Sequence, residues 1–163
     1  MLTLKPTRIL AIDPGTREMG FAVLEGGALR CHGVKVIRRG RSPKETLDRA
    51  RFEVAELIED FRPGVLVVEQ TFIGRNRNTA LLNVLGDEII ALANRNRVKV
   101  LSFAPSTVRK VVCGSGRADK AAVALAVAAR YPELKAFLFK DRKWKERFHA
   151  NMFDAVALGM AAS

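Results

Sequence analysis

The sequence has few cysteines and no long apolar runs, and each shortage excludes a class of protein. Its two cysteines, Cys31 and Cys113, are too few and too far apart for a disulfide framework, and no zinc-binding spacing occurs. No run approaches the ~20 apolar residues of a membrane span. The first ten residues also lack the apolar core of a signal peptide. These absences predict a reduced, cytoplasmic protein that does not enter a membrane.

Acidic residues are scarce relative to basic ones. Seventeen Asp and Glu stand against 28 Lys and Arg, which gives a net charge of +11 and a pI of about 10.4. Such an excess favours a polyanionic partner, nucleic acid ahead of an anionic membrane surface, although a solvated basic surface is the alternative. With 163 residues, 48% of them hydrophobic, and no internal repeat, the chain is expected to form a single domain over residues 1–163.

The hydrophobic pattern alternates between strands and helices. We expect strands at 8–13, 20–24, 29–37, 64–70 and 98–103, and helices at 44–61, 78–97, 105–113, 120–131 and 151–162. Ser42 is a suitable N-cap for the first helix, with Pro43 at its first position. Three early strands followed by alternating helices and strands predict an α/β fold. Its mixed sheet should begin antiparallel and continue with parallel strands.

Two predicted strands end in a carboxylate, Asp13 in "LAIDP" and Glu69 in "LVVEQ". Alone, each has a structural alternative, because aspartate before Pro-Gly is a good turn former and a strand-terminal glutamate can cap a helix. Asp154 interrupts an otherwise apolar helical face. Three converging carboxylates need a cation to offset their repulsion. Oxygen ligands favour Mg²⁺ or Mn²⁺, and two such ions about 4 Å apart serve phosphodiester cleavage. The pattern therefore favours a metal-dependent nuclease.

Nucleotide hydrolysis is the competing interpretation of "IDPGT". That stretch is similar to the first phosphate loop of actin-like ATPases and sugar kinases, but those proteins bind nucleotide between two duplicated domains. The stretch "GSGRADK" is not a Walker A loop, because it lacks the required spacing and the Gly-Lys-Ser/Thr ending. We therefore expect no nucleotide cofactor.

Three stretches could form a nucleic-acid surface. "GSGRADK" places Arg117 and Lys120 at a helix start, where free amides attract phosphate; an ordinary start capped by Asp119 is the alternative. "FIGRNRNT" sets Arg75 and Arg77 beside Phe72, a mixture that suits stacking on distorted DNA unless Phe72 is a core residue. Residues 135–149 carry six Lys and Arg, either as the solvated side of a single amphipathic helix or as a DNA-gripping flank.

The sequence resembles the RuvC family of Holliday-junction resolvases, in the ribonuclease H-like superfamily. The motifs that carry the resemblance are "ILAIDPGTREMGFAVLEGG", "VLVVEQTFIGRNRNTALLNVLG", "FAPSTVRKVVCGSGRADK" and "DAVALGMA". It implies a five-stranded mixed sheet flanked by helices, a homodimer, Mg²⁺ dependence and paired nicks across a four-way junction. By matching positions it implies metal ligands at Asp13, Glu69 and Asp154, a base-stacking Phe72, and DNA contacts by Arg109 and Lys120.

One position departs from the family pattern. A fourth ligand, Asp or His, usually lies one helical turn before the last aspartate, where this chain has Asn151. The i, i+3 spacing puts Asn151 on the same face as Asp154. His149 could serve instead only if the helix began after it. Two other functions stay open: a broader branched-DNA or RNA nuclease of the same fold, and a junction-binding module without catalysis.

Overall fold

The computed structural model describes residues 5–70, 80–139 and 144–163. Within them five strands form one mixed sheet in the order β3-β2-β1-β4-β5. The β1–β2 and β2–β3 pairs are antiparallel, while the β1–β4 and β4–β5 pairs are parallel, which confirms the predicted topology. The strands are β1 (Arg8–Asp13), β2 (Glu18–Glu25), β3 (Ala28–Val36), β4 (Val65–Glu69) and β5 (Lys99–Phe103).

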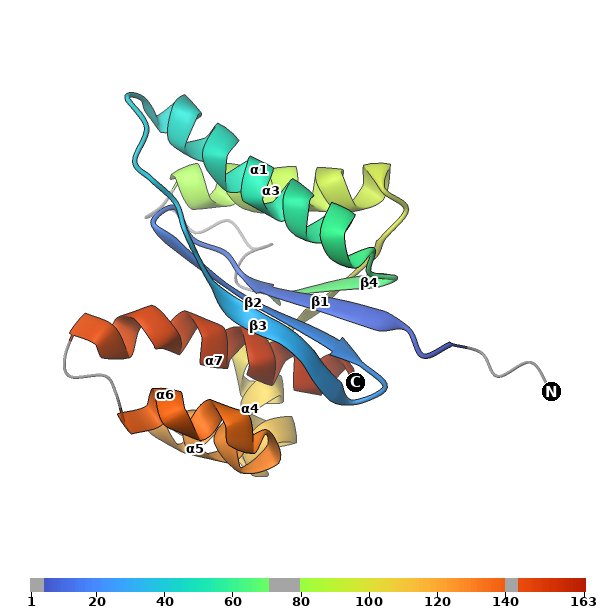
Figure 1. The fold of residues 1–163 in the computed structure, drawn as a ribbon, viewed down its shortest axis with the longest axis vertical. Coiled ribbons are helices and arrows are strands. Elements are labelled where there is room, and N and C mark those ends of the chain that lie inside the picture. Colours follow the sequence, from blue (N-terminus) through green and yellow to red (C-terminus); the bar gives the residue numbers. More distant parts are fainter. Residues whose placement is uncertain (1–4, 71–79, 140–143) are drawn as a thin grey trace.

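Helices cover both faces of this sheet (Figure 1). On one face lie α1 (Pro43–Phe61) and α3 (Ala80–Arg95). On the other lie α4 (Pro105–Cys113), α5 (Lys120–Arg130), the 3₁₀ turn η1 (Pro132–Leu134), α6 (Lys135–Phe139) and α7 (Trp144–Ala162). Alternate residues of β1 therefore enter two cores: Leu10 and Ile12 pack towards α1 and α3, and Ala11 packs towards α7. Burial on both faces explains why β1 and β4 are continuously apolar.

The helix starts follow the predicted capping. The Ser42 hydroxyl accepts a hydrogen bond from the Glu45 amide at the start of α1, and Pro43 occupies the first helical position. The Asp119 carboxylate accepts from the Ala122 amide, 2.7 Å away, at the start of α5. Both caps satisfy backbone donors that the first turn of a helix leaves without a partner.

The C-terminal part differs from the prediction. The last helix was expected from residue 151 but begins at Trp144, and the single helix considered for 135–149 is divided between α6 and α7. The expected start rested on a change from charged to apolar residues. Lys, Arg and Glu are good helix formers, so such a change does not end or begin a helix. Over the described ranges, no helix is long and apolar enough to cross a membrane.

A glycine on β2 brings α7 onto the sheet. Gly20 pairs with Asp13 across the β1–β2 ladder and is fully buried. A Cβ atom at Gly20 would overlap the backbone carbonyl of Asn151 and crowd the Met152 amide. Only glycine allows a backbone to approach a strand this closely. The register of α7 against β1 and β2 is thus set at the residue opposite Asp13.

Candidate active site

A cleft of about 340 Å³ opens at the end of the sheet where β1 and β4 terminate. Its walls come from these two strand ends, the first turns of α4 and α5, and the middle of α7. The polar lining consists of six residues that the sequence had singled out: Asp13, Glu69, Arg109, Lys120, Asn151 and Asp154. Five residues that were not predicted for the site, four of them apolar aliphatic, complete it: Pro105, Val108, Val123, Ala157 and Leu158. Segments far apart in sequence therefore meet at one place.

Asp13 and Glu69 are placed by strand pairing. In the parallel β1–β4 ladder Ala11 is level with Val67, and each carboxylate follows two residues later. Residues two apart on a strand share a face, so the two carboxylates end neighbouring strands at the same level. Strand pairing therefore determines where both carboxylates leave the sheet.

Asn151 and Asp154 come from one face of α7. Both line the cleft, whereas His149 does not, and its ring lies 4.9 Å from that of Phe137. Since α7 is continuous from Trp144, His149 lies about 140° around the helix from Asp154. The geometry therefore supports Asn151 rather than His149 as the fourth polar group of this site.

The carboxylates of the cleft repel one another. Burial, reinforced by Asp154 and Glu69, raises the pKa of Asp13 from 3.8 to about 7, against a smaller lowering by Lys120. Burial also raises the pKa of Asp154, opposed by Lys120. The Lys120 ammonium lies 3.5 Å from Asp154 Oδ2 and forms an ion pair with it. A site of this kind is stabilised by additional positive charge.

The donor set fits a hard divalent cation. Its oxygens come from three carboxylates and one amide, the ligands that Mg²⁺ and Mn²⁺ accept. Among residues 5–70, 80–139 and 144–163, no three His, Cys, Asp or Glu groups already stand close enough to hold a metal ion between them. A cation would relieve the repulsion and draw the carboxylates together.

The predicted DNA-contacting residues are only partly placed. Arg109 and Lys120 line the cleft, and the Lys120 side chain is 79% exposed. Arg117 lies outside the cleft, exposed in the turn before α5, where its amide donates to the Ser115 hydroxyl. Phe72, Arg75 and Arg77 lie outside the described residues. Sequence reasoning also missed Gly20, although a glycine inside a strand is a signal for close backbone approach.

The sheet order, together with carboxylates at the ends of β1 and β4 and on the last helix, defines a ribonuclease H-like nuclease. The family model described as "Crossover junction endodeoxyribonuclease RuvC" matches residues 9–137. The chain belongs to the RuvC family. The match includes Asp13, Glu69, Arg109 and Lys120 but ends before α7, which carries Asn151 and Asp154.

Individual relatives agree with this family. A crossover junction endodeoxyribonuclease RuvC of Halorhodospira halophila is 36% identical over 128 residues, covering 76% of this chain and 76% of that protein. One of Rubrobacter xylanophilus is 38% identical over 118 residues, covering 69% of this chain and 65% of that protein.

Solved structures extend the likeness through α7. Thermus thermophilus RuvC has a TM-score of 0.71 and 25% identity, covering 94% of this chain and 92% of that one. The same protein in complex with a Holliday junction substrate has a TM-score of 0.73 and 24% identity, covering 95% and 92%.

Proposed function

We propose that this chain is a metal-dependent endonuclease that resolves four-way DNA junctions by paired nicks. The observation that carries the proposal is the cleft in which Asp13, Glu69 and Asp154 meet Arg109 and Lys120. Two Mg²⁺ ions, for which Mn²⁺ substitutes, would be held by these carboxylates and Asn151. When bound, they offset charge on the scissile phosphate and assist attack by water. The whole of residues 1–163 is proposed to act as one nuclease domain.

The residues of the chain divide the remaining work. Lys120 begins α5, where the helix dipole adds positive potential, and its exposed side chain can move from Asp154 to a phosphate oxygen. Arg109 offers a planar fork that suits two phosphate oxygens. The apolar side chains of Val108 and Val123 line the same cleft and limit the access of bulk water. The proposed phosphate contacts thus come from α4 and α5, and the carboxylates come from β1, β4 and α7.

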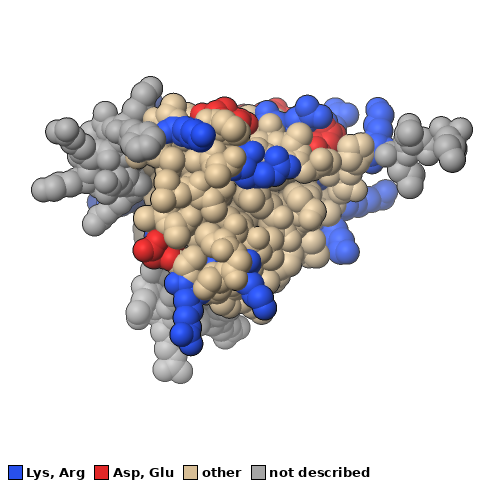
Figure 2. All heavy atoms as spheres, turned by 90° about the horizontal axis from the view of Figure 1, so that it is seen from below, with Lys and Arg blue, Asp and Glu red and all other residues tan. Residues whose placement is uncertain are grey.

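Branched DNA is the proposed substrate. The net charge of +11 favours a nucleic acid, and the related T. thermophilus protein has been solved with a Holliday junction substrate. On the face below the sheet, Lys and Arg lie around the margin of a largely uncharged centre (Figure 2). This distribution favours the margins of that face, rather than its centre, for contact with DNA. We further propose that Phe72 stacks on a base near the junction and that Arg75, Arg77 and Arg117 contact its backbone.

A homodimer follows from paired nicks. Over the described residues each chain carries one cleft with this set of carboxylates. Two symmetrical cuts across one junction therefore require two copies. The proposed dimer would place one cleft at each of two opposed strands.

One assay separates the candidate functions. Purified protein with Mg²⁺ or Mn²⁺ is incubated with a four-way junction, a replication fork, a linear duplex and an RNA–DNA hybrid. Symmetrical paired nicks confined to the junction are expected. Cleavage of all substrates would instead identify a broader nuclease, and tight binding without cleavage would identify a junction-binding module.

The neutral side chain of Asn151 predicts that cleavage needs a high concentration of Mg²⁺. A carboxylate binds Mg²⁺ better than an amide does, so Asn151→Asp is expected to lower the Mg²⁺ concentration for half-maximal cleavage by about tenfold. Mn²⁺ accepts neutral ligands more readily, so its requirement should change less. Metal titrations of cleavage, and of melting temperature in the same buffers, measure both effects.

His149→Ala is the matched control for Asn151→Asp. Because the His149 ring lies against Phe137 and outside the cleft lining, this variant should keep the wild-type metal requirement. A large rise in that requirement would show that His149, and not Asn151, completes the site. If neither variant changes it, the three carboxylates act without a fourth ligand.

A further inference from the structure

A basic loop lies at the same end of the sheet as the cleft. Gly20 pairs with Asp13 on one side and with Val34 of β3 on the other, so β3 leaves the sheet at the end where β1 stops. Residues 37–42 then cross from β3 to α1, on the side where the β1–β2 turn lies (Figure 1). The loop starts two strand spacings from Asp13, which is about 10 Å.

Five basic residues, here called the basic arm, surround this loop. They are Arg17, Arg38, Arg39, Arg41 and Lys44, and all five are exposed. Within the described part of the chain, none of their side chains takes part in an ion pair. The Ile37 amide donates to the Arg17 carbonyl over 2.7 Å, which ties the β1–β2 turn to the loop. The acidic residues nearest in sequence are Glu18, Glu45 and Asp48, so the arm keeps a net positive charge.

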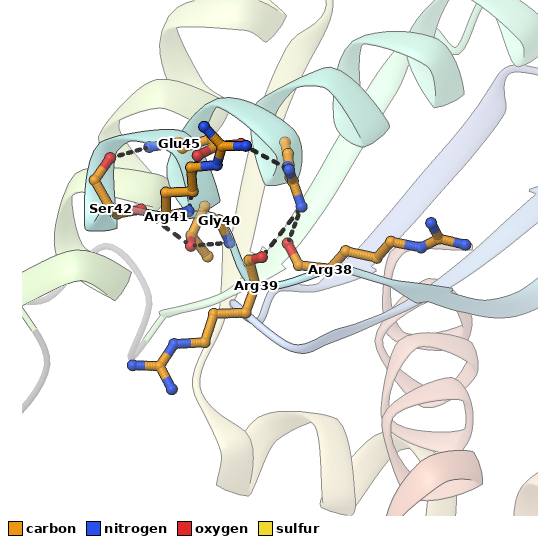
Figure 3. Close-up of polar contacts among 8 residues, drawn as sticks. Arg38, Arg39, Gly40, Arg41, Ser42 and Glu45 are labelled. Atoms are coloured by element: carbon orange, nitrogen blue, oxygen red, sulfur yellow. Dashed lines mark hydrogen bonds and ion pairs between the residues drawn. The ribbon is translucent and has the colours of Figure 1, made fainter.

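The loop backbone is fixed by side chains of α1 (Figure 3). Arg49 Nη1 donates to the carbonyl oxygens of Arg38 and Arg39, over 3.0 and 3.2 Å. The Gly40 amide donates to Thr46 Oγ1 over 2.9 Å, and the Arg41 amide donates to Glu45 Oε2 over 2.7 Å. The hydrogen bond from the Arg41 amide lowers the pKa of Glu45, so this carboxylate stays charged while it holds the loop and Arg49.

These hydrogen bonds use backbone atoms of the loop and leave its arginine side chains available to bind a ligand. The carbonyl groups of Arg38 and Arg39 and the amides of Gly40 and Arg41 bond to side chains of α1. The guanidinium groups of Arg38 and Arg39, by contrast, extend in different directions (Figure 3). An ordered loop pays less entropy when it binds a ligand than a loose one does. A basic surface loop needed only for solubility has no reason to be held in this way.

We propose that the basic arm binds the sugar–phosphate backbone of one DNA duplex of the junction, where that duplex leaves the active-site cleft. This inference rests on the proposed function and adds a DNA contact to it. Guanidinium groups bind phosphate oxygens strongly, and contacts of this kind position DNA without reading its sequence. The loop reaches on the order of 15 Å from Asp13, counting two strand spacings and the residues beyond. The contact should therefore fall on the order of five base pairs from the cut, given 3.4 Å per base pair.

The test compares two variants with the same loss of charge. One is Arg38→Gln/Arg39→Gln/Arg41→Gln. The control is Lys5→Gln/Arg95→Gln/Lys99→Gln, three exposed residues around the opposite end of the sheet that have no ion pair among the described residues. Binding to a junction with arms of about 20 base pairs is measured in EDTA at several salt concentrations, because each phosphate contact adds about 0.9 to the salt slope.

The arm variant is expected to bind about tenfold or more weakly, with a salt slope smaller by about 2 to 3, while the control changes both only slightly. On a junction whose hairpin-capped arms are about four base pairs long, the difference should disappear, because the duplex ends before the basic arm. Equal melting temperatures confirm that both variants are folded.

Equal losses of junction affinity in the two variants would overturn the proposal, because the effect would then be one of net charge alone. A loss of affinity that persists on the junction with short duplexes would overturn the proposed position of the contact along the DNA. These results are distinct from failure of the proposed function, which would appear as wild-type protein that neither cleaves nor prefers the junction.

Discussion

Replacing Asp13 with asparagine is expected to reduce junction cleavage by about a thousandfold, while junction binding is retained. The carboxylate is held at the end of β1, level with Glu69, and both residues line the same cleft as Asp154. An amide is a poorer ligand for a divalent cation and leaves part of the phosphate charge without an opposing charge. Glu69→Gln and Asp154→Asn should have effects of similar size.

Single-turnover cleavage with saturating protein isolates this effect from binding. Affinity for the junction should be unchanged or higher, because each substitution removes a negative charge near the phosphates. A variant that cleaves within about twofold of wild type would show that its residue is not a ligand. Loss of binding together with cleavage would point to misfolding, which the melting temperature detects.

Asp13→Asn, which should abolish most cleavage, is expected to increase the stability of the protein when no metal is present. The pKa of Asp13 is about 7 in the folded protein against 3.8 as its ordinary value, so between these values the folded state binds more protons than the unfolded state. Stability contributed by this group is therefore fully present only well below pH 3.8, and it is lost as the pH rises through about 7. Asp13→Asn removes that loss, and in EDTA at pH 8 its melting temperature should exceed that of wild type by about 5 °C or more.

The pH series supplies the control for this second effect. At pH 3, below the ordinary pKa of 3.8, the Asp13 carboxyl group is mostly protonated in both states, so the two proteins should melt at about the same temperature. Added Mg²⁺ should stabilise wild type at pH 8 and reduce or reverse the difference, since bound ligand stabilises the folded state. A difference that does not depend on pH would show that the carboxylate charge is not its cause.

Gly20→Ala is expected to destabilise the protein by about 3 kcal/mol and to impair cleavage more than its effect on folding explains. The added methyl group would overlap the Asn151 carbonyl, which is backbone and cannot rotate away. To accommodate it, α7 must move from β2 and take Asn151 and Asp154 with it. Chemical denaturation measures the first effect, and metal titration of cleavage at a temperature where the variant is folded measures the second.

Gly33→Ala is the matched control for Gly20→Ala. Gly33 also lies in the sheet, on β3, but an added methyl group there would approach the ring of Phe21 at 3.0 Å rather than backbone. A ring can shift by a few tenths of an ångström, so this variant should cost far less stability and leave the metal requirement unchanged. Equal losses in both variants would mean that α7 is not positioned through Gly20.

Much of the sheet could be predicted, because each strand is marked by the pattern of its own residues. Continuous apolar runs marked the strands, and the carboxylates at their ends pointed to one edge of the sheet, which the positions of Asp13 and Glu69 confirm. The start of α7 could not be found, because charged helix formers precede its apolar part. The ordering of residues 38–41 was also missed. It depends on side chains of α1 that bond to backbone atoms, and no pattern in the loop itself encodes this.

The close contact between Gly20 and α7 has an evolutionary consequence. Two carboxylates of the cleft belong to the hydrogen-bonded sheet, whereas Asn151 and Asp154 belong to a helix that rests on it through side-chain and backbone packing. One part of the cleft lining is therefore fixed by strand pairing, and the other is carried by a helix that packs on the sheet. Under the proposed function, a substitution at Asn151 would change the cation preference without altering the strand pairing. A lineage can thus explore new ionic conditions through a single helix while the rest of the molecule keeps its architecture.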